Sequence, residues 1–235
     1  MVEDLPARTR TLVSPGRNTS STVRASLNRI RLGFVADDLH PYPLTRRTIH
    51  LCVDMQRLFS ATGPWPTPWL DRVLPVVTEL ASRHPEGTVF SRFIPPERAT
   101  DMPGLWQRYY SRWKDVTRQH LDPALLELLP SLANLCPPAK IIDKTRYSAF
   151  AEPNLPEFLH AIEADGLIVT GSETDVCVLA TVLGAVDLGY RVIVVRAVCS
   201  SSDEGHDALI TLFRQRYTEQ IEVADAAVIM ERWEP

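Results

Sequence analysis

The chain has 235 residues, of which 45% are hydrophobic and 23% charged, and its formal net charge is −4. These values indicate an ordinary soluble chain with one main domain that is large enough to bury a sizeable core. The slight acidic balance gives no attraction for nucleic acid or for an anionic membrane, and no apolar run is long enough to span a bilayer. We therefore expect neither a nucleic-acid partner nor a membrane partner.

The cysteine pattern and the N-terminus bear on the compartment. The four cysteines, at positions 52, 136, 177 and 199, have neither the spacing of a disulfide framework nor that of a metal site. The N-terminal arginines are not followed by the apolar core of a secretory signal. We expect a cytoplasmic protein.

Residues 1–47 differ in composition from the rest of the chain. They contain eight arginines, no lysine and four acidic residues, so this part is net positive while the remainder is net negative. We predict an N-terminal basic arm over residues 1–47 and a folded domain over residues 48–235. The arm is either a partly ordered surface segment or a contact with an acidic neighbouring subunit, and the second alternative predicts a homo-oligomer, either a dimer or a tetramer.

Apolar runs alternate with helical segments along residues 48–235. Strands are predicted at 49–55, 89–94, 141–144, 167–169, 191–198 and 221–223, and helices at 69–83, 155–164, 176–188, 203–217 and 224–233. Strands that alternate with helices form a parallel sheet with both faces covered. We predict an α/β fold, a Rossmann-like three-layer sandwich around a central, mostly parallel six-stranded sheet.

The stretch GLIVTGSETDVCVLATVLGAVDLG, residues 166–189, predicts a buried strand, a tight turn and a very apolar helix. Thr174 or Asp175 can cap this helix, and either choice places Cys177 in its first turn, near unpaired backbone donors. A helix terminus lowers the pKa of a thiol by only about one unit, so a nucleophilic Cys177 needs a second cation or base. The alternative is that Cys177 is a small buried hydrophobe.

Two further strands end in ionisable residues. Asp54 lies at the carboxyl end of the strand at 49–55, and Lys144 ends the strand at 141–144. Ligands of open α/β sheets bind outside the carboxyl ends of the strands. We therefore expect Asp54, Lys144 and Cys177 to meet at one edge of the sheet.

The pieces VDMQ, DKTRYSAF and VTGSETDVCVLAT resemble the isochorismatase-like cysteine hydrolases, a family that includes nicotinamidases, N-carbamoylsarcosine amidohydrolases and ureidoacrylate hydrolases. The resemblance covers roughly residues 48–232. It implies that Asp54 takes the thiol proton, Lys144 stabilises the thiolate and Cys177 is the nucleophile. It also implies a cis peptide between Ser172 and Glu173, which aims the amides of Glu173 and Cys177 at an oxyanion. Family members tend to carry smaller or apolar residues at positions 172 and 173, so the charged Glu173 is a departure.

Aromatic residues near these strand ends are candidates for the substrate pocket. Phe59 and Trp65 lie in a proline-rich loop and either shape a pocket or anchor the packing. Residues 106, 109, 110 and 113 form an aromatic helical stripe, typical of a core or subunit contact, although its basic neighbours could recognise a substrate carboxylate. The candidate substrate-binding residues are Phe59, Trp65, Arg92, Phe93, Trp106, Tyr147 and Phe150.

We expect neither a metal nor a cofactor. Nicotinamidase-like members hold a divalent metal with an Asp and two His from the loops after their first two strands, whereas residues 52–83 contain no His here. Without imidazoles or a second local carboxylate cluster, a metal site in these loops is not expected.

The resemblance implies metal-independent hydrolysis of a linear amide, ureido or carbamoyl C–N bond in a small molecule through a Cys thioester. One alternative is the vinyl-ether hydrolysis of isochorismatases, which share this fold but lack the cysteine. Another is a catalytically silent oligomeric binding protein. Cys177 argues against the first alternative, and the complete set of Asp54, Lys144 and Cys177 argues against the second.

Overall fold

The computed structural model describes residues 39–199 and 203–233, except for the side chains of residues 198 and 199. Residues 1–38, most of the predicted arm, lie outside the described residues, so the role of the arm in assembly stays a prediction. Within the described ranges, no helix is long and apolar enough to cross a membrane.

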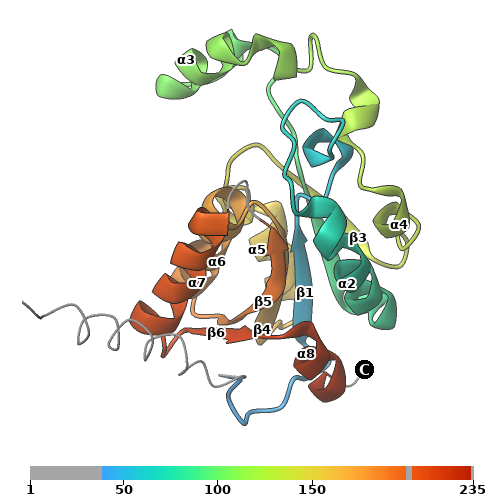
Figure 1. The fold of residues 1–235 in the computed structure, drawn as a ribbon, viewed down its shortest axis with the longest axis vertical. Helices are drawn as coiled ribbons and strands as arrows, with labels where there is room; N and C mark the ends of the chain where they lie inside the picture. The colour runs from blue at the N-terminus through green and yellow to red at the C-terminus, as the bar shows by residue number, and fades with distance from the viewer. Residues whose placement is uncertain (1–38, 200–202, 234–235) are drawn as a thin grey trace, which may run out of the picture. The chain divides into compact units, whose positions relative to one another are not determined.

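The strands form a six-stranded sheet in the order β3-β2-β1-β4-β5-β6, and every neighbouring pair is parallel (Figure 1). They are β1 (Thr48–Val53), β2 (Thr88–Phe93), β3 (Lys140–Lys144), β4 (Gly166–Ser172), β5 (Arg191–Cys199) and β6 (Ile221–Ala224). The predicted α/β fold is confirmed. Because β1, β4 and β5 have both neighbours in the same direction, their carboxyl ends share one edge of the sheet.

Side chains alternate along each central strand between two hydrophobic cores. In β1, Leu51 and Val53 belong to one core, whereas Cys52 belongs to the other. In β4, Leu167 and Ile168 are divided between the cores in the same way. Strands buried on both faces read as unbroken apolar runs, which is why the sequence marks them so clearly.

Helices cover both faces of the sheet, which gives the predicted three layers (Figure 1). Side chains from α2, α4 and α8 pack in the core that contains Cys52, and side chains from α5, α6 and α7 pack in the core that contains Leu51. The described helices are α2 (Leu70–Arg83), α3 (Leu105–Arg112), α4 (Pro130–Ala133), α5 (Asn154–Ala161), α6 (Leu179–Asp187), α7 (Asp203–Arg216) and α8 (Ala226–Arg232).

The segment after β4 is not the single α-helix predicted at 176–188. It begins with a π-helical turn, η7 (Thr174–Val178), and continues as α6. In this turn the amide of Val178 donates to the carbonyl of Glu173, at 3.0 Å. Cys177 therefore lies in a π-helical turn, a feature that is frequent at functional sites. Apolar periodicity could not reveal it, because the segment is apolar on nearly every side.

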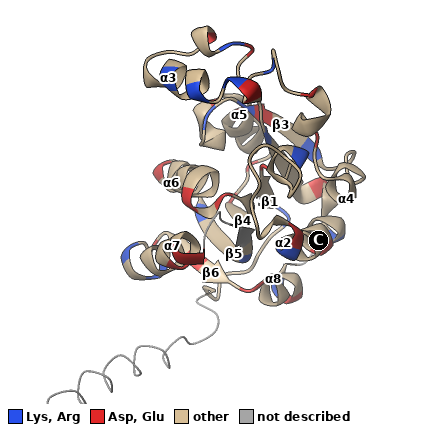
Figure 2. Cartoon of the chain, turned by 45° about the horizontal axis from the view of Figure 1, so that its top comes forward, with Lys and Arg blue, Asp and Glu red and all other residues tan. Residues whose placement is uncertain are grey.

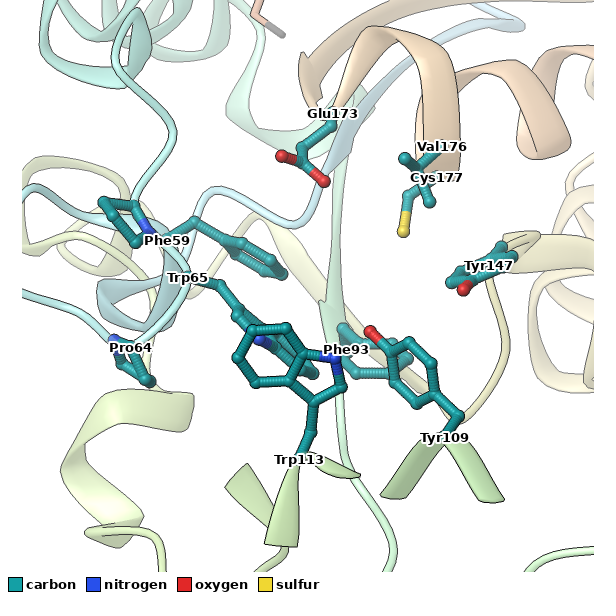
Figure 3. A pocket seen from close by; sticks show the side chains of 11 residues that line it. Phe59, Pro64, Trp65, Phe93, Tyr109, Trp113, Tyr147, Glu173, Val176 and Cys177 are labelled. Atoms are coloured by element: carbon teal, nitrogen blue, oxygen red, sulfur yellow. The ribbon is translucent and has the colours of Figure 1, made fainter. Parts of the chain in front are cut away.

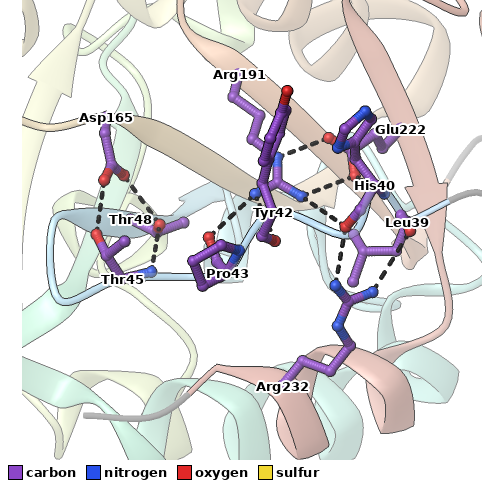
Figure 4. A network of polar contacts seen from close by, with 10 residues as sticks. All are labelled: Leu39, His40, Tyr42, Pro43, Thr45, Thr48, Asp165, Arg191, Glu222 and Arg232. Carbon is purple, nitrogen blue, oxygen red and sulfur yellow. Dashed lines mark hydrogen bonds and ion pairs between the residues drawn. The ribbon is translucent and has the colours of Figure 1, made fainter.

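Residues 39–47, the last part of the predicted arm, are bound to the folded domain by polar contacts (Figure 4). Arg191 of β5 pairs with Glu222 of β6 at 2.6 Å and donates to backbone carbonyls of this segment. Closer to β1, the hydroxyl of Thr45 donates to the carboxylate of Asp165, at 2.6 Å. These contacts fix the path by which the chain enters β1.

Candidate active site

Asp54 follows β1 directly and is fully buried. Its backbone is left-handed, with φ 51°, a conformation that Asp adopts more readily than most residues. Neighbouring β2 fixes its side chain, because the hydroxyl of Ser91 donates to Oδ1 of Asp54 at 2.7 Å. The backbone carbonyl of Ser91 also accepts from the amide of Asp54, at 3.1 Å. The second carboxylate oxygen, Oδ2, is therefore directed away from Ser91.

Lys144 ends β3 and forms a buried ion pair with Asp54. Its Nζ lies 2.7 Å from Oδ2 of Asp54, and the two side chains are 1% and 0% exposed. Nζ also donates to the carbonyl of Arg146 at 2.9 Å and lies 4.9 Å from the centroid of the Phe93 ring. Burial opposes the charge, but attraction to Asp54 and Cys177 outweighs it and raises the pKa of Lys144. Lys144 is thus a fixed cation beside the thiol.

The chain reaches Cys177 along β4, whose end lies very close to the neighbouring strand β1. At Gly171, with φ 110°, a Cβ atom would lie 2.0 Å from the carbonyl oxygen of Val53, so a larger residue does not fit. The peptide bond between Ser172 and Glu173 is cis, as the resemblance implies. Cys177 lies in the turn that follows, with its side chain buried.

The environment of Cys177 differs from that of a simple helix terminus. Burial and the negative charge of Asp54 raise the pKa of the Cys177 thiol, while the charge of Lys144 lowers it, and the net shift is upward. The expected lowering of this pKa by the helix terminus is therefore outweighed. Because this pKa is raised, a nucleophilic Cys177 has to transfer its proton to a base as it reacts, and Asp54 is the carboxylate beside it.

Cys177 opens onto a cavity of about 370 Å³ (Figure 3). This volume lies in the lower part of the range for small-molecule sites. Of the predicted substrate-binding residues, Phe59, Trp65, Phe93 and Tyr147 line the cavity. The other lining residues are Pro64, Pro66, Tyr109, Trp113, Glu173 and Val176.

The remaining three predicted substrate-binding residues lie elsewhere. Arg92 forms ion pairs with Asp143 at 2.8 Å and Glu127 at 3.0 Å, because side chains alternate along β2 and its neighbour Phe93 takes the cavity side. The ring of Trp106 packs against the ring of Tyr147, with 4.9 Å between centroids, and does not line the cavity. Phe150 packs against Gly184 of α6.

The cavity also contains residues that the sequence analysis did not assign to it. Tyr109 and Trp113 belong to the aromatic stripe, expected in a core or subunit contact, yet both line the cavity, while Tyr110 of the same stripe is in the core. The basic neighbours of the stripe, Arg108, Arg112 and Lys114, are all exposed. Figure 2 shows the Lys and Arg positions of α3 in blue. They do not line the cavity.

Ser91 is a further residue that sequence reasoning missed. It is buried in β2, pairs with Val53 in the sheet register and contacts Asp54. The available signal was a serine in the middle of the run TVFSRF, where the other buried positions are apolar except for Thr88, which begins the strand. A polar residue buried at that position needs a hydrogen-bond partner, and Asp54 provides one.

The residues present do not fit the metal of the nicotinamidase-like members. Within the part of the chain that the structure describes, no group of three or more His, Cys, Asp or Glu side chains could hold a metal ion. Asp54, the carboxylate nearest the thiol, is paired with Lys144 instead.

Comparison with known proteins places this arrangement in a family. The Isochorismatase domain family matches residues 48–225. Over 81 residues, the chain is 37% identical to an uncharacterized isochorismatase family protein, PncA, of Bacillus subtilis, which covers 34% of this chain and 44% of that protein. Over 136 residues it is 28% identical to the maleamate amidohydrolase of Pseudomonas putida, which covers 57% and 61% of the two chains. Each match therefore spans less than two thirds of the relative.

Solved structures show the same fold. A cysteine hydrolase from Pseudomonas syringae pv. phaseolicola superposes with a TM-score of 0.70 and 23% identity, over 85% of this chain and 98% of that one. The nicotinamidase/pyrazinamidase PncA of Bacillus subtilis superposes with a TM-score of 0.61 and 23% identity, over 75% and 98%. Because the family match extends over most of the chain and the fold agrees, this protein belongs to the isochorismatase family.

Proposed function

We propose that the protein hydrolyses the C–N bond of a small linear amide, ureido or carbamoyl compound through a cysteine thioester and without a metal. The observation that carries the proposal is the buried contact of Asp54 with Lys144 next to Cys177, where the thiol opens onto a cavity. A structural ion pair alone would not require an adjacent thiol with access to a ligand-sized space.

The first half of the reaction forms the thioester. Sγ of Cys177 attacks the carbonyl carbon while its proton moves to Oδ2 of Asp54. The tetrahedral oxyanion accepts hydrogen bonds from the backbone amides of Glu173 and Cys177, and each such donor typically contributes about 2.7 to 4 kcal/mol of transition-state stabilisation. The C–N bond then breaks, and the departing nitrogen takes the proton from Asp54.

The second half releases the acid. Asp54 takes a proton from water as the oxygen adds to the thioester carbon. The C–S bond breaks, the proton returns to sulfur and the carboxylic or carbamic acid leaves. Lys144 keeps its positive charge throughout and compensates the negative charge that moves between Asp54 and Cys177.

The relatives support amide chemistry over the alternatives. The name of the Pseudomonas putida relative describes an enzyme that acts on the amide maleamate. Vinyl-ether hydrolysis needs no nucleophilic thiol, and a silent binding protein needs no buried ion pair beside one. Among the described side chains, neither Cys136 nor Cys177 is in a disulfide, which suits the reducing cytoplasm that we infer from the composition.

The test is an ammonia-release screen over primary amides, ureido acids and carbamoyl amino acids, followed by mass spectrometry of the trapped acyl-enzyme. Cys177→Ala and Cys177→Ser are expected to lose turnover and the adduct while their melting temperatures stay near that of the wild type. The matched control is Cys136→Ser, which changes a cysteine outside the cavity. This variant is expected to keep both turnover and the trapped adduct. More than a few per cent of the wild-type rate in either Cys177 variant would exclude the covalent mechanism.

A chelation experiment tests the metal-independent part. Activity is expected to survive prolonged incubation with a chelator, because no three His, Cys, Asp or Glu side chains of the described ranges are grouped so that they could hold a metal ion. Loss of activity on chelation, with recovery on adding zinc, iron or manganese, would contradict this part and leave the thioester chemistry untouched.

A further inference from the structure

The charge of the cavity next to Cys177 is one-sided. Among the described residues that line it, Glu173 is the single charged one, and the others are aromatic, apolar or the thiol itself. Lys144 does not line the cavity, and its charge is paired with Asp54. A ligand in this cavity therefore meets a carboxyl group and no cation.

Glu173 lacks a strong partner within the protein. Its side chain enters the cavity from the same segment as Cys177 (Figure 3). Thr67 donates to Oε1 at 3.5 Å, which is long for a hydrogen bond between oxygens, and no ion pair within the described ranges contains Glu173. Burial, with a contribution from the charge of Asp175, raises the pKa of Glu173. Burying a carboxylate without a cation is costly, and a positive ligand group would remove that cost.

The rings that face Glu173 across the cavity form walls. The ring of Trp65 meets the ring of Trp113 at an interplanar angle of 83°, with 5.9 Å between centroids, and the ring of Tyr109 at 52°, with 6.2 Å. The Trp65–Trp113 pair packs edge to face and the Trp65–Tyr109 pair is tilted, so the rings contact one another without stacking face to face. Ring faces attract ammonium groups, most strongly when water is excluded.

We propose that this cavity selects a substrate that carries an ammonium group, either primary or methylated, with Glu173 as its counter-ion and Trp65, Trp113 and Tyr109 as its aromatic walls. The inference rests on the proposed amide hydrolysis and specifies the substrate class. The amide carbon lies at Cys177 and the ammonium group lies at the other end of a short linker. Amides with a free carboxylate at that end are disfavoured, because the like charge of Glu173 opposes them and no cation of the lining compensates.

The experiment compares three amides of similar size. The first is glycine betaine amide, the second is its neutral isostere in which carbon replaces the quaternary nitrogen, and the third is succinamate. Ammonia release gives kcat/KM for each in the wild type and in Glu173→Gln. We expect the wild type to prefer the cation to its isostere, and Glu173→Gln to lower this ratio by about tenfold or more, the size typical of a partly desolvated cation site. The electron-withdrawing ammonium activates the amide carbonyl equally in both proteins, so the change in the ratio reports the contribution of Glu173.

The matched control is Glu157→Gln, which removes the same charge from an exposed position on α5. It is expected to keep the wild-type ratio. Equal kcat/KM for the cation and its isostere in the wild type would overturn the inference, and so would a ratio that is the same in Glu173→Gln as in the wild type.

A binding measurement separates this inference from the proposed function. Calorimetric titration of Cys177→Ala with glycine betaine amide and its isostere needs no turnover. In Cys177→Ala, the cation is expected to bind about tenfold more tightly than the isostere, and adding Glu173→Gln should remove this difference in affinity. If these results are obtained but the wild type hydrolyses none of the three amides, the cation site stands and the amide chemistry fails. No preference for the cation in Cys177→Ala would overturn the inference whatever the hydrolysis assay shows.

Discussion

The substitution Lys144→Met removes the ammonium group from the buried pair and keeps the length of the side chain. Nζ lies 2.7 Å from Oδ2 of Asp54, and both side chains are inaccessible to water, so the substitution leaves a buried carboxylate without its cation. Breaking such a pair by removing one partner costs about 3 to 5 kcal/mol. For a protein of this size, that loss lowers the melting temperature by roughly 6 to 20 °C.

A double substitution tests the cause of this loss. Asp54→Asn with Lys144→Met removes both charges, and the Asn oxygen can still accept the hydrogen bond from Ser91. Most of the stability is expected to return, although turnover is not. The matched control is Lys140→Met on the same strand, where the side chain is exposed, and its effect is expected to stay below about 1 kcal/mol.

The chemical role of Lys144 is measured by alkylation of Cys177. The charge of Lys144 lowers the pKa of this thiol, so in Lys144→Met the apparent pKa for reaction with iodoacetamide is expected to rise by more than about one unit. Peptide mass spectrometry separates the alkylation of Cys177 from that of the other cysteines. If Lys144→Met alkylates with the wild-type pH profile, Lys144 is only a structural counter-ion and the reasoning on the thiolate is refuted.

Three further predictions concern the surroundings of the site. Ser91→Ala removes the donor to Asp54 and is expected to lower kcat about tenfold with KM nearly unchanged, whereas Ser91→Thr should restore kcat. An unaltered kcat and pH profile in Ser91→Ala would exclude a positioning role for Ser91. Burial, with the charge of His84, lowers the pKa of His50 from 6.5 to about 3, so the stability measured by urea unfolding is expected to be full above pH 6.5 and to fall toward pH 3. This fall with pH should be less steep in His50→Gln, and an equal dependence of stability on pH in the two proteins would contradict the prediction. Sedimentation is expected to give a homo-oligomer that is weakened by deletion of residues 1–36, because the half-buried side chains of α6 are apolar as well as those in the core. A monomer at micromolar concentration would refute this prediction.

The sequence by itself determined the sheet and the juxtaposition of the three ionisable residues. Unbroken apolar runs mark strands that are buried on both faces, and their alternation with helices leaves a parallel sheet as the natural arrangement. In a parallel sheet the carboxyl ends share an edge, so residues placed just after β1, at the end of β3 and after β4 have to approach one another. Asp54, Lys144 and Cys177 do so, and no knowledge of the loops was needed.

Only the tertiary structure decided what surrounds the thiol. The connection between β2 and β3 contains no regular strand, and its path, which brings Tyr109 and Trp113 to the cavity, depends on contacts far apart in the sequence. Side chains alternate between the two faces of β2, so moving the strand by one residue would exchange the positions of Arg92 and Phe93. Only the structure decides that Phe93 faces the cavity and Arg92 does not. The pKa of Cys177 likewise depends on burial and on charges from two other strands, so the local helix terminus could not predict its direction.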